Sequence, residues 1–600
     1  MDGMASSSLF PAPPLIQFPS KEDGCDRCGR RLKVRKTNTR KVNTLHIGPF
    51  YATETVGICP ACQCTYPSDQ LAKLVAPGAN FGYDILVYVG KALFLRHRRS
   101  REITVELQAR NIRISPSEVD LLARKFIVYL AIAHRQCSGR IKQVMRRQGG
   151  YIFHLDGTCE GKGPFLVSGL DSLTEIVLGN VKLPSEKADK IVPFLEEIKQ
   201  VFGHPMALVH DMGSGILKAV AKVFPHTPDF ICHYHFLRDI GKDLFEEEYD
   251  LIRKRLRKHG LTTPLHYRAK KLKEIIDEDP ALIDVFYKGV QNKNFSDSSL
   301  EWMPAVSAYS LIQWALDGKN QGQGYGFPFD RPHVVFAQRL YAIYSQLDAF
   351  TNIHLRSRWR DNKPLFKLSR DLMAVVSDKI LQRTMTEIES KIAIFDELRD
   401  AMRIAPKAGS EGLNSDDIKT PIHTIEKSVQ DFRKRLAHSP EYPTRKDHQK
   451  MIAQIDKYWK KLFADPIIVD TPDGTVSIQP QRTNNIMERF FRDFRRRSRR
   501  KTGNNSMNKT LQTMLADTPL VRNLENPQYM DLLLEGKATL EERFAEIDAD
   551  MVRKHLREAR NNPEKIPAKI KRIIAAPQLP EIIANLFHNK AKTPESNRIL

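Results

Sequence analysis

The spacing of apolar residues changes several times along the chain. Between residues 81 and 148, apolar side chains recur every three or four positions, which is the period of amphipathic helices. Between 151 and 232 they form short runs interrupted by two helical segments, and from 251 to 480 the helical period returns with many Lys and Glu residues. This pattern predicts an α/β unit between two helical regions.

The α/β unit has a defined order of elements. The pattern predicts three strands, a helix, a strand, a second helix and a fifth strand, in turn over residues 151–155, 164–170, 175–183, 186–202, 206–210, 214–224 and 229–232. This is the element order of the ribonuclease-H-like fold, in which the first and fourth strands are neighbours. We therefore expect such a core, followed by a large all-helical insertion.

Two short helices are expected in the first helical region. One covers residues 101–110, and Ser115-Pro116 begins the other, because Ser is a common N-cap and Pro suits the first helical position. Two helices joined by a tight turn and flanked by basic residues are typical of a helix-turn-helix, whose second helix enters the major groove of DNA. The alternative is an ordinary helical hairpin with a solvated basic face. The candidate DNA-binding residues are Arg98, Arg99, Arg101, Arg124 and Lys125.

The overall charge favours a polyanionic partner. The 600 residues include 94 Lys and Arg against 71 Asp and Glu, which leaves a formal net charge of +23. Nucleic acid fits this charge. We expect no membrane partner, because the sequence has no apolar run of about 18 residues. The Pro-rich amino terminus lacks a secretory pattern, so we expect an intracellular protein, cytoplasmic and nucleoid-associated in a prokaryote and nuclear in a eukaryote.

Five of the eight cysteines are clustered near the amino terminus. Cys25 and Cys28 form one C-x-x-C pair, and Cys59 and Cys62 form another. This spacing lets four thiolates bind one Zn²⁺ ion, and the alternating apolar residues between the pairs predict the short strands of a zinc ribbon. Four protein ligands leave no open position for water, so the site is structural. Cys64 could replace Cys62 as a ligand, and the alternative to a metal site is free thiols on a loop.

Three carboxylates are candidates for a catalytic metal site. Asp156 follows the first predicted strand and Asp211 follows the fourth, although Asp156 alone could belong to a turn and Asp211 could cap a helix. Glu488 begins a later helix, which Asn484 or Asn485 is expected to cap. We expect the three carboxylates to hold two Mg²⁺ or Mn²⁺ ions. Such a pair activates a water or a 3′-hydroxyl and stabilises the leaving oxygen of a phosphodiester.

Arginines follow Glu488 at helical spacing. They would lie alongside the metal site and neutralise phosphates, whereas the alternatives are a solvated face or a nuclear-targeting signal. The candidate DNA-binding residues of this helix are Arg489, Arg492, Arg495, Arg496, Arg499 and Arg500.

Four motifs resemble those of a known family. They are HLDGT (154–158), VHDMG (209–213), CHYHFLRD (232–239) and NNIMER (484–489) with its Arg-rich continuation. Together they are similar to motifs of the DDE transposases of bacterial insertion sequences and their Mutator-like relatives, over roughly residues 25–503. The resemblance implies hydrolytic nicking at transposon ends and attack of the freed 3′-hydroxyl on target DNA, with Asp156, Asp211 and Glu488 in the DDE roles. The residues after 503 match no function of that family.

One motif of this resemblance has an open role. Cys232-x-x-His235 is similar to an element that many such transposases carry after the second aspartate, where it is taken to be structural or to position DNA. From the residues alone it could be half of a metal site, or a buried cysteine beside a hydrogen-bonding histidine.

These patterns predict a multidomain DNA transposase. It would act as a homo-oligomer on double-stranded DNA, both transposon ends and target. The alternatives are a domesticated, transposase-derived DNA-binding regulator without catalysis and a ribonuclease-H-like structure-selective nuclease. The expected parts are a flexible N-terminus (1–20), a zinc ribbon (21–76), a helix-turn-helix-like DNA-binding domain (77–148), the first part of the ribonuclease-H-like core (149–250), the helical insertion (251–480), the core helix with Glu488 (481–510) and a basic helical tail (511–600).

Overall fold

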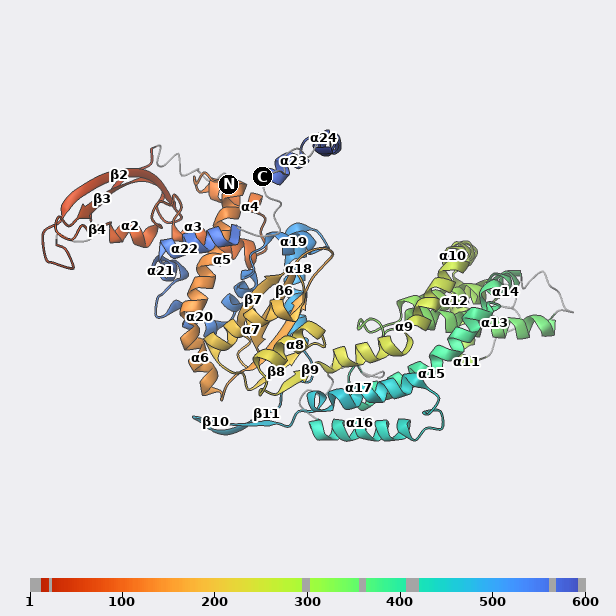
Figure 1. Ribbon diagram of the computed structural model, residues 1–600. Coiled ribbons are helices and arrows are strands. Elements are labelled where there is room, and N and C mark those ends of the chain that lie inside the picture. The colour runs from red at the N-terminus through yellow and green to blue at the C-terminus, as the bar shows by residue number, and fades with distance from the viewer. Residues whose placement is uncertain are drawn as a thin grey trace.

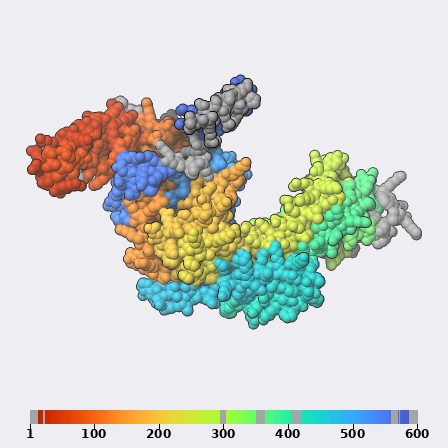
Figure 2. Space-filling model, viewed as in Figure 1, coloured from red at the N-terminus to blue at the C-terminus, as the bar shows by residue number. Residues whose placement is uncertain are grey.

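The molecule has a central α/β body with a projection on either side. The computed structural model describes residues 12–20, 24–293, 303–354, 363–405, 420–560 and 568–591. Figure 1 shows a module of strands at one end, the central body, and a long helical arm at the other end. The space-filling view shows the module and the arm standing out from the body (Figure 2). No helix in the described ranges combines the length and apolarity needed to cross a membrane.

A five-stranded sheet forms the centre of the body. Its strands are β5 (Ile152–Thr158), β6 (Phe165–Asp171), β7 (Val177–Leu183), β8 (Ala207–His210) and β9 (Asp229–Ile231). They lie in the order β7-β6-β5-β8-β9. β5 pairs antiparallel with β6 and parallel with β8, so the first and fourth strands are neighbours, as predicted. All five predicted strands are present because each is a short apolar run that the sheet buries.

Helices pack against this sheet and share one hydrophobic core with it. α7 (Ala188–Phe202) and α8 (Ser214–Val223) connect the strands, as predicted. The helices before the sheet are α3 (Tyr83–Phe94), α4 (Ser100–Ala109), α5 (Pro116–Gln136) and α6 (Ser138–Arg147). Ser115 caps α5, since its Oγ accepts the N–H of Glu118 at 3.2 Å. From residue 126 to 134, however, every residue of α5 is buried, so this part of the helix is a core element without a free face.

The N-terminal module is a small sheet with one helix. It contains β1 (Leu15–Phe18), β2 (Lys33–Thr44), β3 (Gly48–Ile58), β4 (Thr65–Tyr66) and α2 (Asp69–Leu74). β3 lies between β1 and β2, which leaves β2 at the edge. The expectation of a flexible N-terminus is wrong for residues 15–18, because β1 pairs in parallel with β3; residues 1–11 lie outside the described part of the chain.

The helical arm has its own hydrophobic core. Its helices are α9 (His233–His259), α10 (Thr262–Asp277), α11 (Ala281–Asn292), α12 (Met303–Asp317), the 3₁₀ helix η2 (Gly318–Asn320), α13 (Pro332–His354), α14 (Lys363–Val376), α15 (Lys379–Ala401), α16 (Ile422–Ala437) and α17 (Lys446–Leu462). α9 begins two residues after the end of β9 and leads, with a kink at Phe245, into the arm (Figure 1). The arm therefore begins at the end of the sheet rather than at residue 251.

The insertion is not all-helical. The strands β10 (Ile467–Thr471) and β11 (Gly474–Ile478) form an antiparallel hairpin, which the helical period of this region did not predict. Its side chains Ile467 and Ile478 pack near Ile152 and Val209 of the central sheet. The missed signal was the Asp473-Gly474 turn after a β-branched run.

The chain after the hairpin returns to the central body. It forms α18 (Asn485–Thr502), α19 (Asn508–Thr513), η3 (Thr518–Glu525), α20 (Pro527–Leu534), α21 (Leu540–Ala545), α22 (Ala549–Arg560), α23 (Ala568–Ile574) and α24 (Leu579–Ala591). Buried residues between Leu511 and Val552 belong to the same core as the sheet. Asn523 also completes the edge strand β7, since its Nδ2 donates to Val177 O at 2.9 Å and its Oδ1 accepts the Val177 N–H at 2.8 Å. Residues 511–552 are thus part of the body, and not an appended tail.

Candidate functional site

Asp156 and Asp211 lie next to each other at one edge of the central sheet. The residues that directly precede them pair in the parallel register of β5 and β8. Asp156 Oδ1 accepts the N–H of Gly157 at 2.7 Å, and Asp211 Oδ1 accepts the N–H of Gly213 at 3.0 Å. The structure thus brings together two aspartates that the sequence singled out.

Glu488 reaches the same edge because Asn484 anchors its helix to β5. The buried Asn484 side chain donates from Nδ2 to Leu155 O at 3.0 Å, and its Oδ1 accepts from His154 Nδ1 at 2.9 Å. The Asn484 backbone N–H also points at Cys232 Sγ, 3.2 Å away. Asn484 is the residue before α18, but its side chain makes no capping bond. Asn484 therefore occupies the predicted N-cap position, but its side chain binds the sheet and not its own helix.

A fourth carboxylate, Glu186, belongs to the acidic site formed by Asp156, Asp211 and Glu488. A Cβ atom at position 213 would lie 2.8 Å from Glu186 Oε1 and 3.1 Å from Asp211 Oδ1, so these two carboxylates flank Gly213. A Cβ at Gly215 would lie 1.7 Å from Glu186 O, so only glycine permits this close approach. The sequence pattern predicted that Glu186 begins the helix over residues 186–202, but α7 begins at Ala188. Its position just after a third strand was the available signal.

Crowding makes the acidic site costly to charge. Burial raises the pKa of Asp156 well above its usual value, and the negative charges of Asp211, Glu488 and Glu186 raise it further. Burial also raises the pKa of Glu186 and of Glu488. A divalent cation would reverse this effect, because it stabilises several carboxylates in the charged form at once. Oxygen donors of this kind suit Mg²⁺ or Mn²⁺.

The predicted DNA-binding residues fall into two groups with different surroundings. The six predicted arginines of α18 are exposed, whereas its seventh arginine, Arg497, is half-buried and paired with Glu525. Arg492, Arg495 and Arg499 follow Glu488 at helical spacing. In the first helical region, Arg98 contacts Glu102 and Glu106, and Arg99 Nε donates to Lys501 O at 3.2 Å. Arg101 and Arg124 are exposed, while Lys125 is half-buried.

Cys232 and His235 are packed against the acidic site. Cys232 is fully buried, and burial raises the pKa of its thiol to about 12. Burial lowers the pKa of His235 to about 3, and its Nε2 lies 3.9 Å from Glu488 Oε1. A neutral thiol that faces the Asn484 amide and a neutral imidazole beside Glu488 favour the structural interpretation over half of a metal site.

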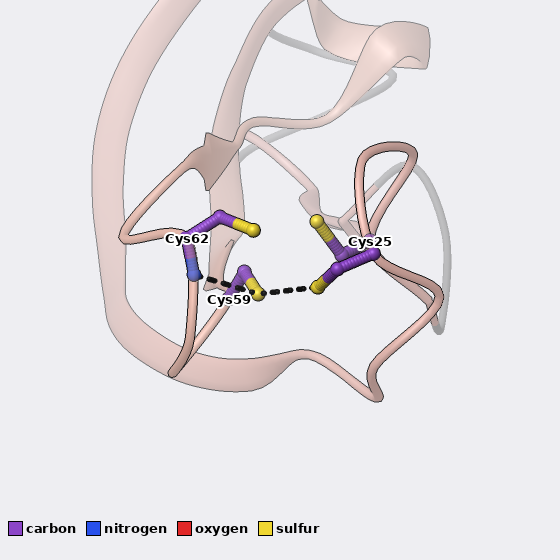
Figure 3. Close-up of side chains that lie close together, drawn as sticks. Cys25, Cys59 and Cys62 are labelled. Atoms are coloured by element: carbon purple, nitrogen blue, oxygen red, sulfur yellow. Dashed lines mark hydrogen bonds between the residues drawn. The ribbon is translucent and has the colours of Figure 1, made fainter.

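Four cysteines form the second site. Cys25, Cys28, Cys59 and Cys62 have sulfur atoms that all lie within 4.8 Å of one another and could hold a metal ion such as zinc. Figure 3 shows Cys25, Cys59 and Cys62 converging from two turns. The Sγ atoms of Cys28 and Cys59 are 3.6 Å apart, and the Cys62 N–H lies 3.3 Å from Cys59 Sγ. Cys64 is outside this group, and its carbonyl oxygen accepts a hydrogen bond from the Cys59 N–H at 2.9 Å.

The two sites differ in how closely their ligands approach. Within the described ranges, the four cysteines have ligand atoms that all lie within 4.8 Å of one another. The carboxylates of the acidic site do not form a group this tight. The acidic site supplies oxygen donors, which suit hard cations, and its carboxylates are spread more widely than the four sulfurs.

No family model matches this chain, and no curated protein matches it. The geometry of the two sites therefore carries the functional argument.

The acidic site predicts a trade-off between charge and stability. When folding raises the pKa of a carboxyl group, the free energy of unfolding falls as the pH rises from the pKa of the unfolded state, about 3.9 for Asp, to the pKa of the folded state. Above the folded-state pKa this loss of stability remains constant. We therefore expect Asp156→Asn to raise the unfolding temperature of the protein at pH 7 without added Mg²⁺, by roughly 2–4 °C for each kcal/mol relieved. The gain should shrink toward pH 4. Thermal unfolding across this pH range measures it, with exposed Asp189→Asn as the control; a lower unfolding temperature for Asp156→Asn would contradict the prediction.

Asn484 should matter more than its neighbour Asn485. Asn484→Ala leaves Leu155 O and His154 Nδ1 without their buried partner, at a cost of about 1–3 kcal/mol for each group. We expect a lower unfolding temperature and a displaced Glu488. Half-buried Asn485 is the matched control. Equal effects of Asn484→Ala and Asn485→Ala in a thermal unfolding assay would show that the anchoring bonds are unimportant.

Proposed function

We propose that this chain is a DDE-type DNA transposase with a ribonuclease-H-like catalytic core. The observation that carries the proposal is the meeting of Asp156, Asp211 and Glu488 at one edge of the sheet. Glu488 belongs to α18, and Asn484, which anchors this helix to Leu155 of β5, lies 329 residues after Leu155 in the sequence. Natural chains rarely bury like charges together without a cation or a chemical task. The strand order β7-β6-β5-β8-β9 agrees with the proposed fold.

The roles of the side chains follow from their positions. Asp156, Asp211, Glu186 and Glu488 would hold two Mg²⁺ or Mn²⁺ ions, which supply a metal-activated nucleophile and stabilise the leaving oxygen. Asn484 keeps Glu488 against β5. Neutral His235 and Cys232 line the buried side of Glu488 and exclude water from it.

The arginines of α18 would bind the substrate backbone. They are exposed on the helix that carries Glu488, so phosphates held by Arg492, Arg495 and Arg499 would run past the carboxylates. Double-stranded DNA is the proposed substrate, as transposon end and as target, and a homo-oligomer would be needed to join two ends to one target. The Cys₄ site would hold a zinc ribbon in shape.

Cleavage of the gene's own flanking DNA tests the proposal. Labelled duplexes that carry these ends are incubated with the protein and Mg²⁺ or Mn²⁺, and the products are separated on a denaturing gel. Nicked ends together with joined products support a transposase. Binding without cutting would indicate a DNA-binding regulator, and cutting that depends on DNA structure without joining would indicate a structure-selective nuclease.

A further inference from the structure

The edge strand β2 carries an unusual concentration of exposed positive charge. Its residues from Lys33 to Thr39 are all exposed. Together with the preceding turn, it presents seven exposed cations against one acid, Asp26. The cations are Arg27, Arg30, Arg31, Lys33, Arg35, Lys36 and Lys41.

The side chains of these cations form no ion pair with another described residue. The ion pairs of the described residues include none of the seven, whereas Arg98 of the predicted reader is held between two glutamates. Arg40, the other cation of β2, is half-buried and contacts Ala79 O. Charged side chains on an edge strand, especially Lys, protect it from pairing with another chain, but three of the seven cations lie in the turn before β2 and not on its edge. Seven unpaired charges exceed that need and indicate an anionic partner.

The shape of the module suits a long, regular polyanion. β2 has 12 residues, and the stretch from Lys33 to Lys41, which carries its exposed cations, spans roughly 27 Å, or about four-fifths of one turn of B-DNA at about 34 Å. A register shift between Val34 and Lys36 marks a bulge at Arg35, which re-aims side chains at the edge. The module projects from the body (Figures 1 and 2), so a duplex can approach β2 without a clash with the sheet.

The Cys₄ site lies where it would hold this strand rigid. Its two C-x-x-C turns precede β2 and follow β3, and Lys33 of β2 pairs with Ile58 of β3 next to Cys59. The predicted reader offers less free surface, because the second half of α5 is buried. We propose that the exposed cations of β2 and its preceding turn bind the sugar-phosphate backbone of double-stranded DNA. The inference deepens the proposed function, since it names where the DNA partner is held.

Binding of the full-length protein to a duplex of random sequence tests this inference. Backbone contacts do not depend on sequence, so the ends need not be known. The zinc-loaded protein is titrated without Mg²⁺ against a labelled duplex of about three helical turns, between about 0.05 and 0.2 M salt. The test variant is Arg35→Gln/Lys36→Gln/Lys41→Gln. The matched control removes three exposed, unpaired lysines of the arm, as Lys254→Gln/Lys258→Gln/Lys270→Gln.

We expect the β2 variant to bind roughly 10- to 100-fold more weakly than wild type at about 0.1 M salt, with a salt slope smaller by about 2.7. The control should bind like wild type, and zinc content should be unchanged in both. Equal weakening by the two variants, or no weakening by the β2 variant, overturns the inference. The inference is also overturned if the β2 variant binds the duplex normally and loses only its binding to a single-stranded RNA, titrated in parallel. If wild type cleaves DNA and the β2 variant binds DNA normally, only this inference is refuted. If wild type never cleaves DNA and the β2 variant has lost DNA binding, only the proposed transposase activity is refuted.

Discussion

Asp156→Asn, Asp211→Asn and Glu488→Gln should each lower metal-dependent DNA cleavage by at least roughly 10³-fold. Each change removes one charged oxygen ligand from ions that contribute several kcal/mol to the transition state, and about 4 kcal/mol corresponds to this factor. Binding to DNA should persist, because the arginines of α18 and the cations of β2 remain. Single-turnover cleavage of labelled ends, with binding measured in parallel, separates the two effects.

The control for this series is Asp189→Asn. Asp189 is an exposed carboxylate at the start of α7, three residues from Glu186, and its near partner is Lys190 at 3.2 Å. It should cleave like wild type. Full activity of Glu488→Gln would show that the third carboxylate is misassigned, and Glu186 would then be the first residue to replace.

Cys59→Ser should cost the protein its tightly bound zinc and the fold of the N-terminal module. Cys59 is fully buried, and its Sγ contacts both the Sγ of Cys28 and the N–H of Cys62. Structural zinc sites of this kind contribute about 10–16 kcal/mol of binding free energy near neutral pH, which is also folding free energy. Loss of one ligand therefore exceeds what the small core around Phe18, Val42 and Phe50 can replace.

Metal analysis and limited proteolysis measure this outcome. We expect close to one zinc per chain in the wild type and a large loss in Cys59→Ser, with new cleavage sites confined to the module. Cys64→Ser is the matched control, because Cys64 lies outside the sulfur cluster. Unchanged zinc in Cys59→Ser, or an equal loss in Cys64→Ser, would show that these four thiols are not the ligand set.

The electrostatics of the sulfur cluster agree with a bound cation. A hydrogen bond from Tyr66 lowers the pKa of Cys25 to about 6, whereas contact with Cys28 raises the pKa of Cys62 to about 12. Four thiols this close cannot all ionise without a positive charge among them. A zinc ion would supply that charge and would keep all four as thiolates.

The sequence alone determined the features that depend on local pattern. Period-two and period-3.6 runs predicted the five strands and two helices of the central sheet in their observed order, because each element buries a face of its own. The C-x-x-C spacing predicted the cysteine cluster, since two residues between ligands set the bite of each pair. Asp156 and Asp211 were found because each follows an apolar run that predicted a strand, although β5 itself continues past Asp156 to Thr158.

Only the tertiary structure decided the features that depend on contacts between distant segments. Glu186 joins the acidic site through the approach of Gly215, and Asn484 binds β5 and not its own helix. Arg98 proved to be paired and the cations of β2 free. Residues 511–552 entered the core, where Asn523 completes an edge strand. Apart from Glu186, whose position just after a strand was a signal, these features have no local signature, because a side chain's partner is set by the packing of the whole chain and not by its neighbours in sequence.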